Sequence, residues 1–187
     1  RRFAHGPPAP SGYHALFGHP QGARVRGEAT PSYCWWPPAA QRIRDYSPAM
    51  KWILLFRDPV SRAYSQWNMR RTDGSVQVSF AQAVDEEIRR GAEVPVRNNV
   101  GTSYLSRGFY AQQLARIFGL FPREQVLTLR SEWLRDDPSA ALRRVHAFLG
   151  IAPKDDAGPA EAHVGAYAEP LDAATRARHV LRAAAAA

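Results

Sequence analysis

Lys51-Trp-Ile-Leu-Leu-Phe-Arg57-Asp-Pro-Val-Ser-Arg-Ala-Tyr-Ser65 is the stretch that decides the fold of this chain. Its apolar run, residues 52–56, is short, continuous and bounded by a turn signal, which is typical of a strand buried on both faces of a parallel sheet. The Asp-Pro pair after Arg57 has the residues expected at the N-cap and first position of a helix. The sequence therefore predicts a strand that ends at Arg57 and a helix that begins at once.

The junction between this strand and this helix carries the residues of an anion site. In open α/β sheets, ligands bind beyond the carboxyl ends of the strands, where Arg57 is placed. Arg57 has a planar fork of N–H donors, and Ser65, two turns into the helix, has a hydroxyl that can reach the same anion. We call this pair the Arg57–Ser65 junction, and it predicts phosphate binding. An arginine that only caps its own sheet stays open as a second interpretation, because such junctions occur in many α/β proteins.

The rest of the chain alternates helices with a short strand. A second buried strand is predicted at residues 125–129. Apolar periodicity and turn signals predict helices over residues 37–46, 59–71, 80–90, 104–121, 138–149 and 173–182, with loops at 93–102 and 151–167. This alternation predicts an α/β fold in which helices flank a parallel sheet.

The 187 residues suit a single domain. Residues 1–27 are rich in Gly, Pro and His and predict an irregular segment. Residues 28–150 form the predicted core, and residues 151–187 form a C-terminal loop and helix. The chain does not begin with methionine, so we expect further sequence upstream.

Basic residues outnumber acidic ones by 25 to 17, and only Lys51 and Lys154 are lysines. The excess of arginine favours an anionic ligand, and a GC-rich genome is the other explanation of an Arg- and Ala-rich composition. The arginines are dispersed and no RNA-binding signature is present, so no nucleic-acid partner is predicted. The single Cys34 excludes an internal disulfide and a cysteine-based zinc site, and no metal is expected.

No segment reaches the length of a membrane span, and the first residues lack the apolar core of a signal peptide. Together with the single cysteine, this favours the bacterial cytoplasm as the location. The sequence predicts no particular oligomeric state.

Three separated blocks resemble the sulfotransferases that use 3′-phosphoadenosine 5′-phosphosulfate (PAPS), especially the heparan sulfate sulfotransferases and their bacterial relatives. The Arg57–Ser65 junction resembles the family's 3′-phosphate signature. Residues 27–33, Gly-Glu-Ala-Thr-Pro-Ser-Tyr, resemble its Glu-Lys-(Ser/Thr)-Pro-x-Tyr element. Residues 104–110, Tyr-Leu-Ser-Arg-Gly-Phe-Tyr, and the stretch from there to residue 150 resemble the part of the family that follows.

The resemblance implies a P-loop-NTPase-like fold and a role for individual residues. Arg57 and Ser65 would hold the 3′-phosphate of PAPS, and Glu28 would be the catalytic base. The loop that would cover the donor, where related enzymes carry Lys-Gly-Arg, is His163, Val164 and Gly165. Candidate contacts with donor or acceptor are Tyr33, Ser106, Arg107 and Gly108.

Two departures from the family are visible. Its second donor site is a P-loop-like segment with a lysine that binds the 5′-phosphosulfate, and neither Lys51 nor Lys154 fits that place. We therefore expect the domain to be incomplete at its N-terminus. The second departure is Ala29, where heparan-type enzymes usually have lysine, and this puts a heparan-like acceptor in doubt.

The implied reaction moves a sulfuryl group from PAPS, without a metal, to the hydroxyl or amine of a small-molecule, lipid or carbohydrate acceptor, and releases adenosine 3′,5′-bisphosphate (PAP). His14 or His19 is the next candidate for the base if Glu28 is not. Two alternatives stay open: a non-catalytic anion- or nucleotide-binding module, and a relative of the P-loop-type nucleotide kinases.

Overall fold

The computed structural model describes residues 10–15, 17, 22–91, 101–153, 167, 171, 173 and 176. The chain divides into two compact units, Arg1–Thr30 and Pro31–Ala187. In the first unit, helix α1 (Pro10–Ala15) is followed by residues 22–30 without helix or strand. The ring of Tyr13 meets that of Phe17 edge-on at 5.1 Å, so this segment has local order within the irregular region that the sequence predicts.

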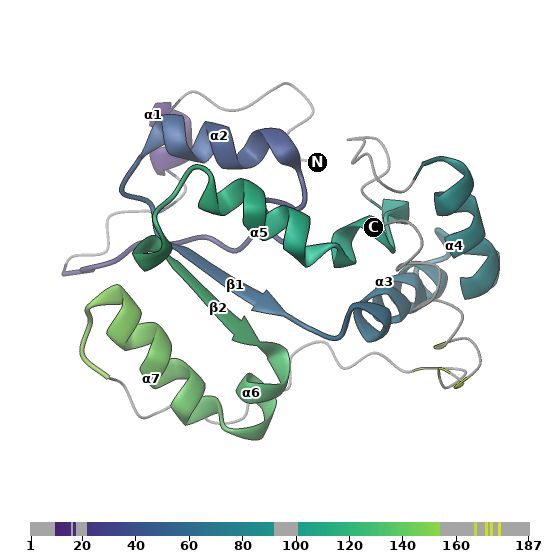
Figure 1. Ribbon diagram of the computed structural model, residues 1–187. Helices are drawn as coiled ribbons and strands as arrows, with labels where there is room; N and C mark the ends of the chain where they lie inside the picture. The colour runs from purple at the N-terminus through teal and green to yellow at the C-terminus, as the bar shows by residue number, and fades with distance from the viewer. Residues whose placement is uncertain are drawn as a thin grey trace. The chain divides into compact units, whose positions relative to one another are not determined.

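The second unit holds the sheet and most of the helices. In chain order its elements are α2 (Pro37–Tyr46), β1 (Trp52–Phe56), α3 (Pro59–Thr72), α4 (Phe80–Arg89), η2 (Ser106–Gly108), α5 (Tyr110–Phe118), η3 (Arg123–Gln125), β2 (Val126–Arg130), α6 (Ser131–Asp136) and α7 (Pro138–Leu149) (Figure 1).

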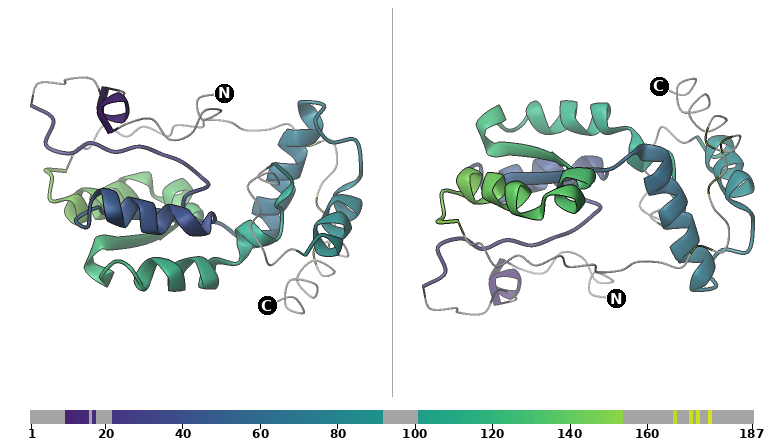
Figure 2. Two further views of the ribbon diagram at one scale, coloured as in Figure 1. Left: turned by 90° about the horizontal axis from the view of Figure 1, so that it is seen from above. Right: turned by 90° about the horizontal axis from the view of Figure 1, so that it is seen from below.

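The two strands lie side by side and run parallel, from the Trp52–Val126 pair to the Phe56–Arg130 pair. Figures 1 and 2 show α5 and α7 on opposite sides of this strand pair. A parallel pair needs a crossover connection, which α3, α4 and α5 provide here. The predicted α/β arrangement of a parallel sheet flanked by helices is confirmed for the described residues.

One hydrophobic cluster covers a single face of β1. Trp52 and Leu54 are buried there against α2 and α5, together with Ala40, Ile117 and Phe121. The alternate side chains of β1 point the other way, and Ile53 and Leu55 remain 41% and 51% exposed. The prediction of a strand buried on both faces is therefore wrong for the described residues. The helices α6 and α7 that follow β2 make their main sheet contacts with β2 rather than β1.

A second cluster joins α3 to α4 and to the residues before η2. Its buried members are Ala63, Tyr64, Trp67, Phe80, Ala83, Val84, Tyr104 and Leu105. Helix α4 starts on a capping box, in which Ser79 and Gln82 bond reciprocally to each other's backbone N–H. Helix α7 ends at Gly150, whose φ of 72° is the left-handed conformation that glycine adopts at little cost.

The predicted helix over residues 104–121 is wrong in its first turn and a half. Helix α5 begins only at Tyr110, and residues 106–108 form the short turn η2. The backbone N–H groups of Tyr104, Leu105 and Ser106 donate to the buried Glu87 carboxylate. The backbone N–H groups of this segment thus donate to a side chain of another helix. This is a long-range contact, which helical periodicity cannot predict.

Among the helices of the described residues, none combines the length and apolar character that a membrane crossing requires.

Candidate anion-binding site

Arg57 lies where the sequence predicts it, directly after the last residue of β1 and before α3, and its side chain is exposed. Figure 1 shows β1 leading straight into α3. The ring of Phe56, the last strand residue, packs 4.4 Å from that of Tyr110 at the start of α5. Burial raises the pKa of Tyr110. The charge of Arg62 and a hydrogen bond with the backbone of Arg57 act in the opposite direction and lower this pKa. The backbone at Arg57 is thereby held against α5, while Arg57 itself is exposed.

The start of α3 is capped as predicted. The Asp58 carboxylate accepts from the backbone N–H of Ser61 at 2.9 Å and from its hydroxyl at 2.7 Å, and Pro59 opens the helix. Ser61 and Ser65 are four residues apart and therefore share one face of the helix. Ser65 is half-buried on that face. Arg57 and the first turns of α3 thus follow the carboxyl end of β1, and the N–H groups of Arg57 and the hydroxyl of Ser65 are the donors that they offer to an anion.

Two residues from far along the chain contact this same face of α3. The hydroxyl of Tyr167 donates to Ser65 Oγ at 3.0 Å, and its ring stacks on that of Tyr64 with centroids 5.9 Å apart. The Arg176 guanidinium lies 3.1 Å from Asp58 Oδ1 and donates to Ser61 Oγ at 3.3 Å. Sequence reasoning missed both as site residues, because nothing separates Tyr167 and Arg176 from other residues of an Ala- and Arg-rich tail.

The predicted donor-covering residues His163, Val164 and Gly165 lie outside the described residues. Their assignment therefore stays a prediction.

Glu87 is a buried carboxylate that organises the segment before η2. Only 4% of Glu87 is exposed. Its Oε2 accepts from the backbone N–H of Tyr104 at 2.5 Å and of Leu105 at 2.7 Å. Its Oε1 accepts from the backbone N–H of Ser106 at 3.1 Å and from the Ser106 hydroxyl at 3.0 Å. Arg62 donates to the carbonyl of Tyr104, so an α3 cation braces the same loop.

Of the candidate contacts at η2, Ser106 is already engaged by protein. Its hydroxyl accepts from Trp35 Nε1 at 3.0 Å and donates to Glu87. Arg107 lies over the ring of Trp35 at 4.8 Å and donates to Ser32 Oγ at 3.1 Å. Burial lowers the pKa of Arg107. The network ties α4 through η2 to the segment of Ser32 and Tyr33.

Gly108 and Tyr33 occupy packed positions. A Cβ on Gly108 would stand 3.0 Å from Cβ of Pro59, which is closer than ordinary contact, so η2 approaches the start of α3 tightly. Tyr33 packs at the edge of the cluster that covers β1. The ligand contacts suggested for Tyr33, Ser106, Arg107 and Gly108 remain predictions.

Glu28 belongs to the first unit, where its side chain is exposed. Its role as base remains a prediction.

Lys51 cannot serve the Arg57–Ser65 junction. It precedes β1, at the opposite end of the strand from Arg57, and six residues of extended chain span about 20 Å. Its ammonium donates to the carbonyl of Phe148 at 2.5 Å and lies 4.9 Å from the centroid of that ring. Lys154 lies outside the described residues.

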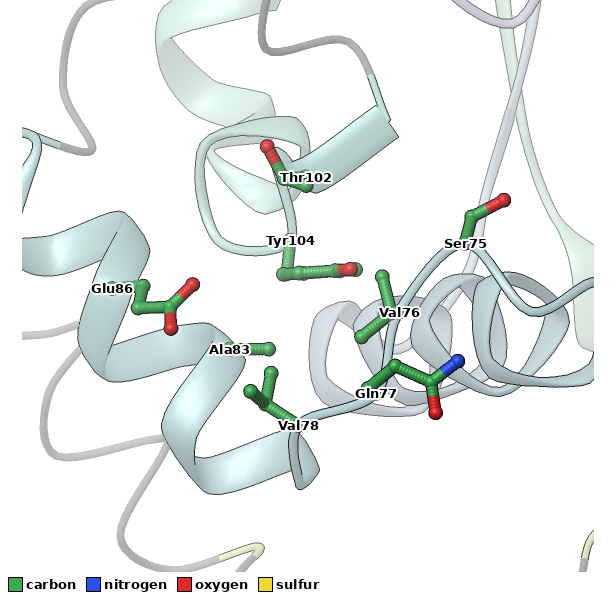
Figure 3. Close-up of a pocket in the computed structure, with 8 residues that line it drawn as sticks. All are labelled: Ser75, Val76, Gln77, Val78, Ala83, Glu86, Thr102 and Tyr104. Atoms are coloured by element: carbon green, nitrogen blue, oxygen red, sulfur yellow. The ribbon is translucent and has the colours of Figure 1, made fainter.

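A separate pocket of about 230 Å³ lies between α4 and the loop after α3 (Figure 3). It is lined by Ser75, Val76, Gln77, Val78, Ala83, Glu86, Thr102 and Tyr104. The Tyr104 hydroxyl is buried there without a hydrogen-bond partner among the described residues, and burial raises the pKa of Tyr104. None of the predicted site residues that the structure describes lines this pocket.

Within the ranges that the structure describes, no three His, Cys, Asp or Glu side chains gather as a metal site would require.

The cap of α3 makes a testable contribution to stability. Burial alone would raise the pKa of Asp58, but hydrogen bonds from Ser61 and the charge of Arg176 bring it below its usual value. Asp58→Ala should therefore cost about 0.5–2 kcal/mol of unfolding free energy at neutral pH. Because the folded pKa is depressed, this contribution is present above about pH 4, the unfolded value, and is lost as pH falls through the folded value.

Urea unfolding at pH 7 and at pH 3 measures this effect. The difference in unfolding free energy between wild type and Asp58→Ala should be smaller at pH 3 than at pH 7. Asp136→Ala, which changes an exposed residue that caps no helix, should differ little from wild type in unfolding free energy at either pH. A gap of equal size at both pH values would contradict the assigned role of the carboxylate.

The chain is similar to known proteins in both sequence and structure. A model of the sulfotransferase domain family matches residues 40–164. Heparan sulfate glucosamine 3-O-sulfotransferase 6 of Mus musculus is 32% identical over 139 residues, which cover 74% of this chain and 39% of that protein. The human bifunctional heparan sulfate N-deacetylase/N-sulfotransferase 3 is 28% identical over 129 residues, covering 67% of this chain and 14% of that protein.

Among solved structures, a sulfotransferase from Alicyclobacillus acidocaldarius matches with a TM-score of 0.80 and 27% identity, covering 98% of this chain and 70% of that chain. The present chain spans well under half the length of the curated relatives above. The range matched by the family model includes Arg57, Ser65 and η2, while Glu28, Tyr167 and Arg176 lie outside it.

Proposed function

The chain belongs to the sulfotransferase domain family, and on that premise we propose that it transfers a sulfuryl group from PAPS to an acceptor hydroxyl or amine. In the proposed step the acceptor atom bonds to sulfur while the bond from sulfur to the bridging oxygen breaks. PAP leaves, and the proton of the acceptor passes to the Glu28 carboxylate.

The observation that carries this proposal is the Arg57–Ser65 junction. An exposed arginine at the carboxyl end of a parallel strand leads into a capped helix, and a serine two turns later lies on the face where Asp58 and Ser61 stand. Guanidinium and hydroxyl groups bind phosphate through their N–H and O–H donors. Their place supports an assignment of Arg57 and Ser65 to the 3′-phosphate, where they would orient the donor for in-line transfer.

The names of the relatives support a carbohydrate acceptor, since two of them are named for heparan sulfate glucosamine or heparan sulfate. Ala29, beside the proposed base, differs from the lysine of the heparan-type element and argues for a different acceptor. Transfer of labelled sulfate to a panel of a heparan oligosaccharide, a simple phenol and a glycolipid would separate the acceptor classes.

Calorimetric titration with PAP, ATP and a sulfated glycan tests the class of the protein. Binding of PAP in preference to ATP would support a sulfotransferase. Preference for ATP would favour a kinase relative, and binding of the glycan alone would favour a non-catalytic module and contradict the proposal.

Arg57→Ala should weaken PAP binding by about 10- to 100-fold, because a hydrogen-bonded charge pair contributes about 1.5–3 kcal/mol. Adenosine 5′-monophosphate (AMP) lacks the 3′-phosphate, so its affinity should change little in the same variant. Arg130→Ala is the matched control, because Arg130 ends the neighbouring strand opposite Phe56. Equal loss in both variants would indicate a general effect of positive charge at this sheet edge, and would contradict a specific Arg57 contact.

A further inference from the structure

The described residues of the C-terminal segment meet α3 along the face that carries the proposed phosphate donors. Arg176 bridges Asp58 and Ser61 at the first turn, and Tyr167 reaches Ser65 one turn later. Leu171, which lies between them in the sequence, packs against the cluster that joins α3 and α4. Tyr167 and Arg176 therefore contact one stripe of α3, and Leu171 contacts the cluster beside it.

The charge of Asp58 explains why a cation is needed at this place. Asp58 directly follows Arg57 and holds a carboxylate at the helix start, where it would repel a phosphate bound at the Arg57–Ser65 junction. Arg176 lies 3.1 Å from that carboxylate and offsets its charge. The guanidinium has five N–H donors in a planar fork, so it can hold Asp58 and Ser61 and still present an N–H to a second anion.

Distances along the helix place that second anion within reach. Side chains four residues apart on a helix stand about 5–6 Å from one another. Arg176 donates to Ser61 Oγ, so a phosphate bound by Ser65 lies one helical turn from the guanidinium. Tyr167 donates to Ser65 Oγ, which directs the proton of the Ser65 hydroxyl away from the tyrosine and leaves it available to a phosphate oxygen.

We propose that Arg176 is a further binding residue for the 3′-phosphate of the donor, and that Tyr167 positions the Ser65 hydroxyl for the same group. This inference rests on the proposed function. Among residues 163–165, the sequence His-Val-Gly offers no arginine or lysine to the donor. Arg176 supplies the guanidinium from a position about ten residues further along the chain.

The test compares PAP with AMP, two ligands that differ by the 3′-phosphate, by calorimetric titration of the whole chain. Arg176→Gln keeps a long polar side chain but removes the charge. It should weaken the binding of PAP by about 10- to 100-fold, while the affinity for AMP changes by less than about twofold. Arg143→Gln, at an exposed position of α7, is the matched control and should leave both affinities unchanged.

A second variant separates ligand binding from folding. Tyr167→Phe keeps the ring that stacks on Tyr64 and removes only the hydroxyl. The thermal unfolding temperature should therefore stay close to that of wild type, while the affinity for PAP falls by about five- to tenfold.

The outcomes distinguish this inference from the function on which it rests. An unchanged ratio of PAP to AMP affinity in Arg176→Gln would overturn the role of Arg176, whether both affinities fall together or neither falls. If Arg57→Ala still lowers that ratio, the proposed function survives. A wild-type chain that binds PAP no better than AMP would overturn the proposed function itself.

Discussion

Glu87→Ala should lower the unfolding free energy of the second unit by about 3–5 kcal/mol, the range seen when one partner of a buried charged network is removed. The change leaves the backbone N–H groups of residues 104–106 without their acceptor inside the protein. It also removes a negative charge that acts on Arg62, whose pKa burial already lowers. Since whole domains are stable by about 5–15 kcal/mol, this is a large fraction of the total.

Urea unfolding followed by circular dichroism measures the loss. The matched control is Glu86→Ala, one residue earlier on α4, which makes the same change in helix propensity but keeps the carboxylate that accepts from the backbone of residues 104–106. The stability of Glu87→Gln should fall between those of Glu87→Ala and Glu86→Ala. The glutamine oxygen can still accept hydrogen bonds on one side, but its NH2 group on the other side faces N–H donors. A Glu87→Ala variant as stable as the Glu86→Ala control would show that the network contributes little.

The elements that local chemistry determines could be predicted from the sequence. The start of α3 follows from the Asp-Pro pair, and the end of α7 follows from Gly150, because caps are decided by a few neighbouring residues. The parallel pairing of β1 with β2 follows from two short apolar runs separated by helical periodicity.

The elements that distant contacts determine could not be predicted in this way. The periodicity of residues 104–121 predicts one helix, but Glu87 captures the backbone of its first residues. The exposure of Ile53 and Leu55 depends on which strand α6 and α7 cover. The sequence of β1 does not show which strand that is.

The residues of the candidate site fall into the same two groups, those predictable from local sequence and those placed by distant contacts. Arg57 and Ser65 share one continuous stretch, so their spacing along a helix could be read directly. Tyr167 and Arg176 stand 102 and 115 residues from their partners Ser65 and Ser61, and only the fold brings them together. Only a sequence element supports the role of Glu28, so activity is the decisive measurement for it.

Glu28→Gln should lower the turnover of sulfuryl transfer by about 100- to 10,000-fold, the usual contribution of a general base. Glutamine has nearly the same shape as glutamate but cannot take a proton from the acceptor at neutral pH. The donor does not require that proton transfer to bind, so PAP affinity should stay within about twofold of wild type. A fall in turnover without a fall in PAP affinity is the signature of a group that acts in the chemical step.

The measurement follows transfer of labelled sulfate from PAPS, with Glu124→Gln, an exposed glutamate on η3, as the control. The pH profile adds a second readout, because loss of the base should remove the limb on which activity rises with pH. Undiminished turnover in Glu28→Gln would exclude this carboxylate and move the role to a histidine such as His14, whose substitution would then flatten that limb. Absence of transfer by the wild-type full-length protein, with PAP binding intact, would argue that the Arg57–Ser65 junction serves recognition alone.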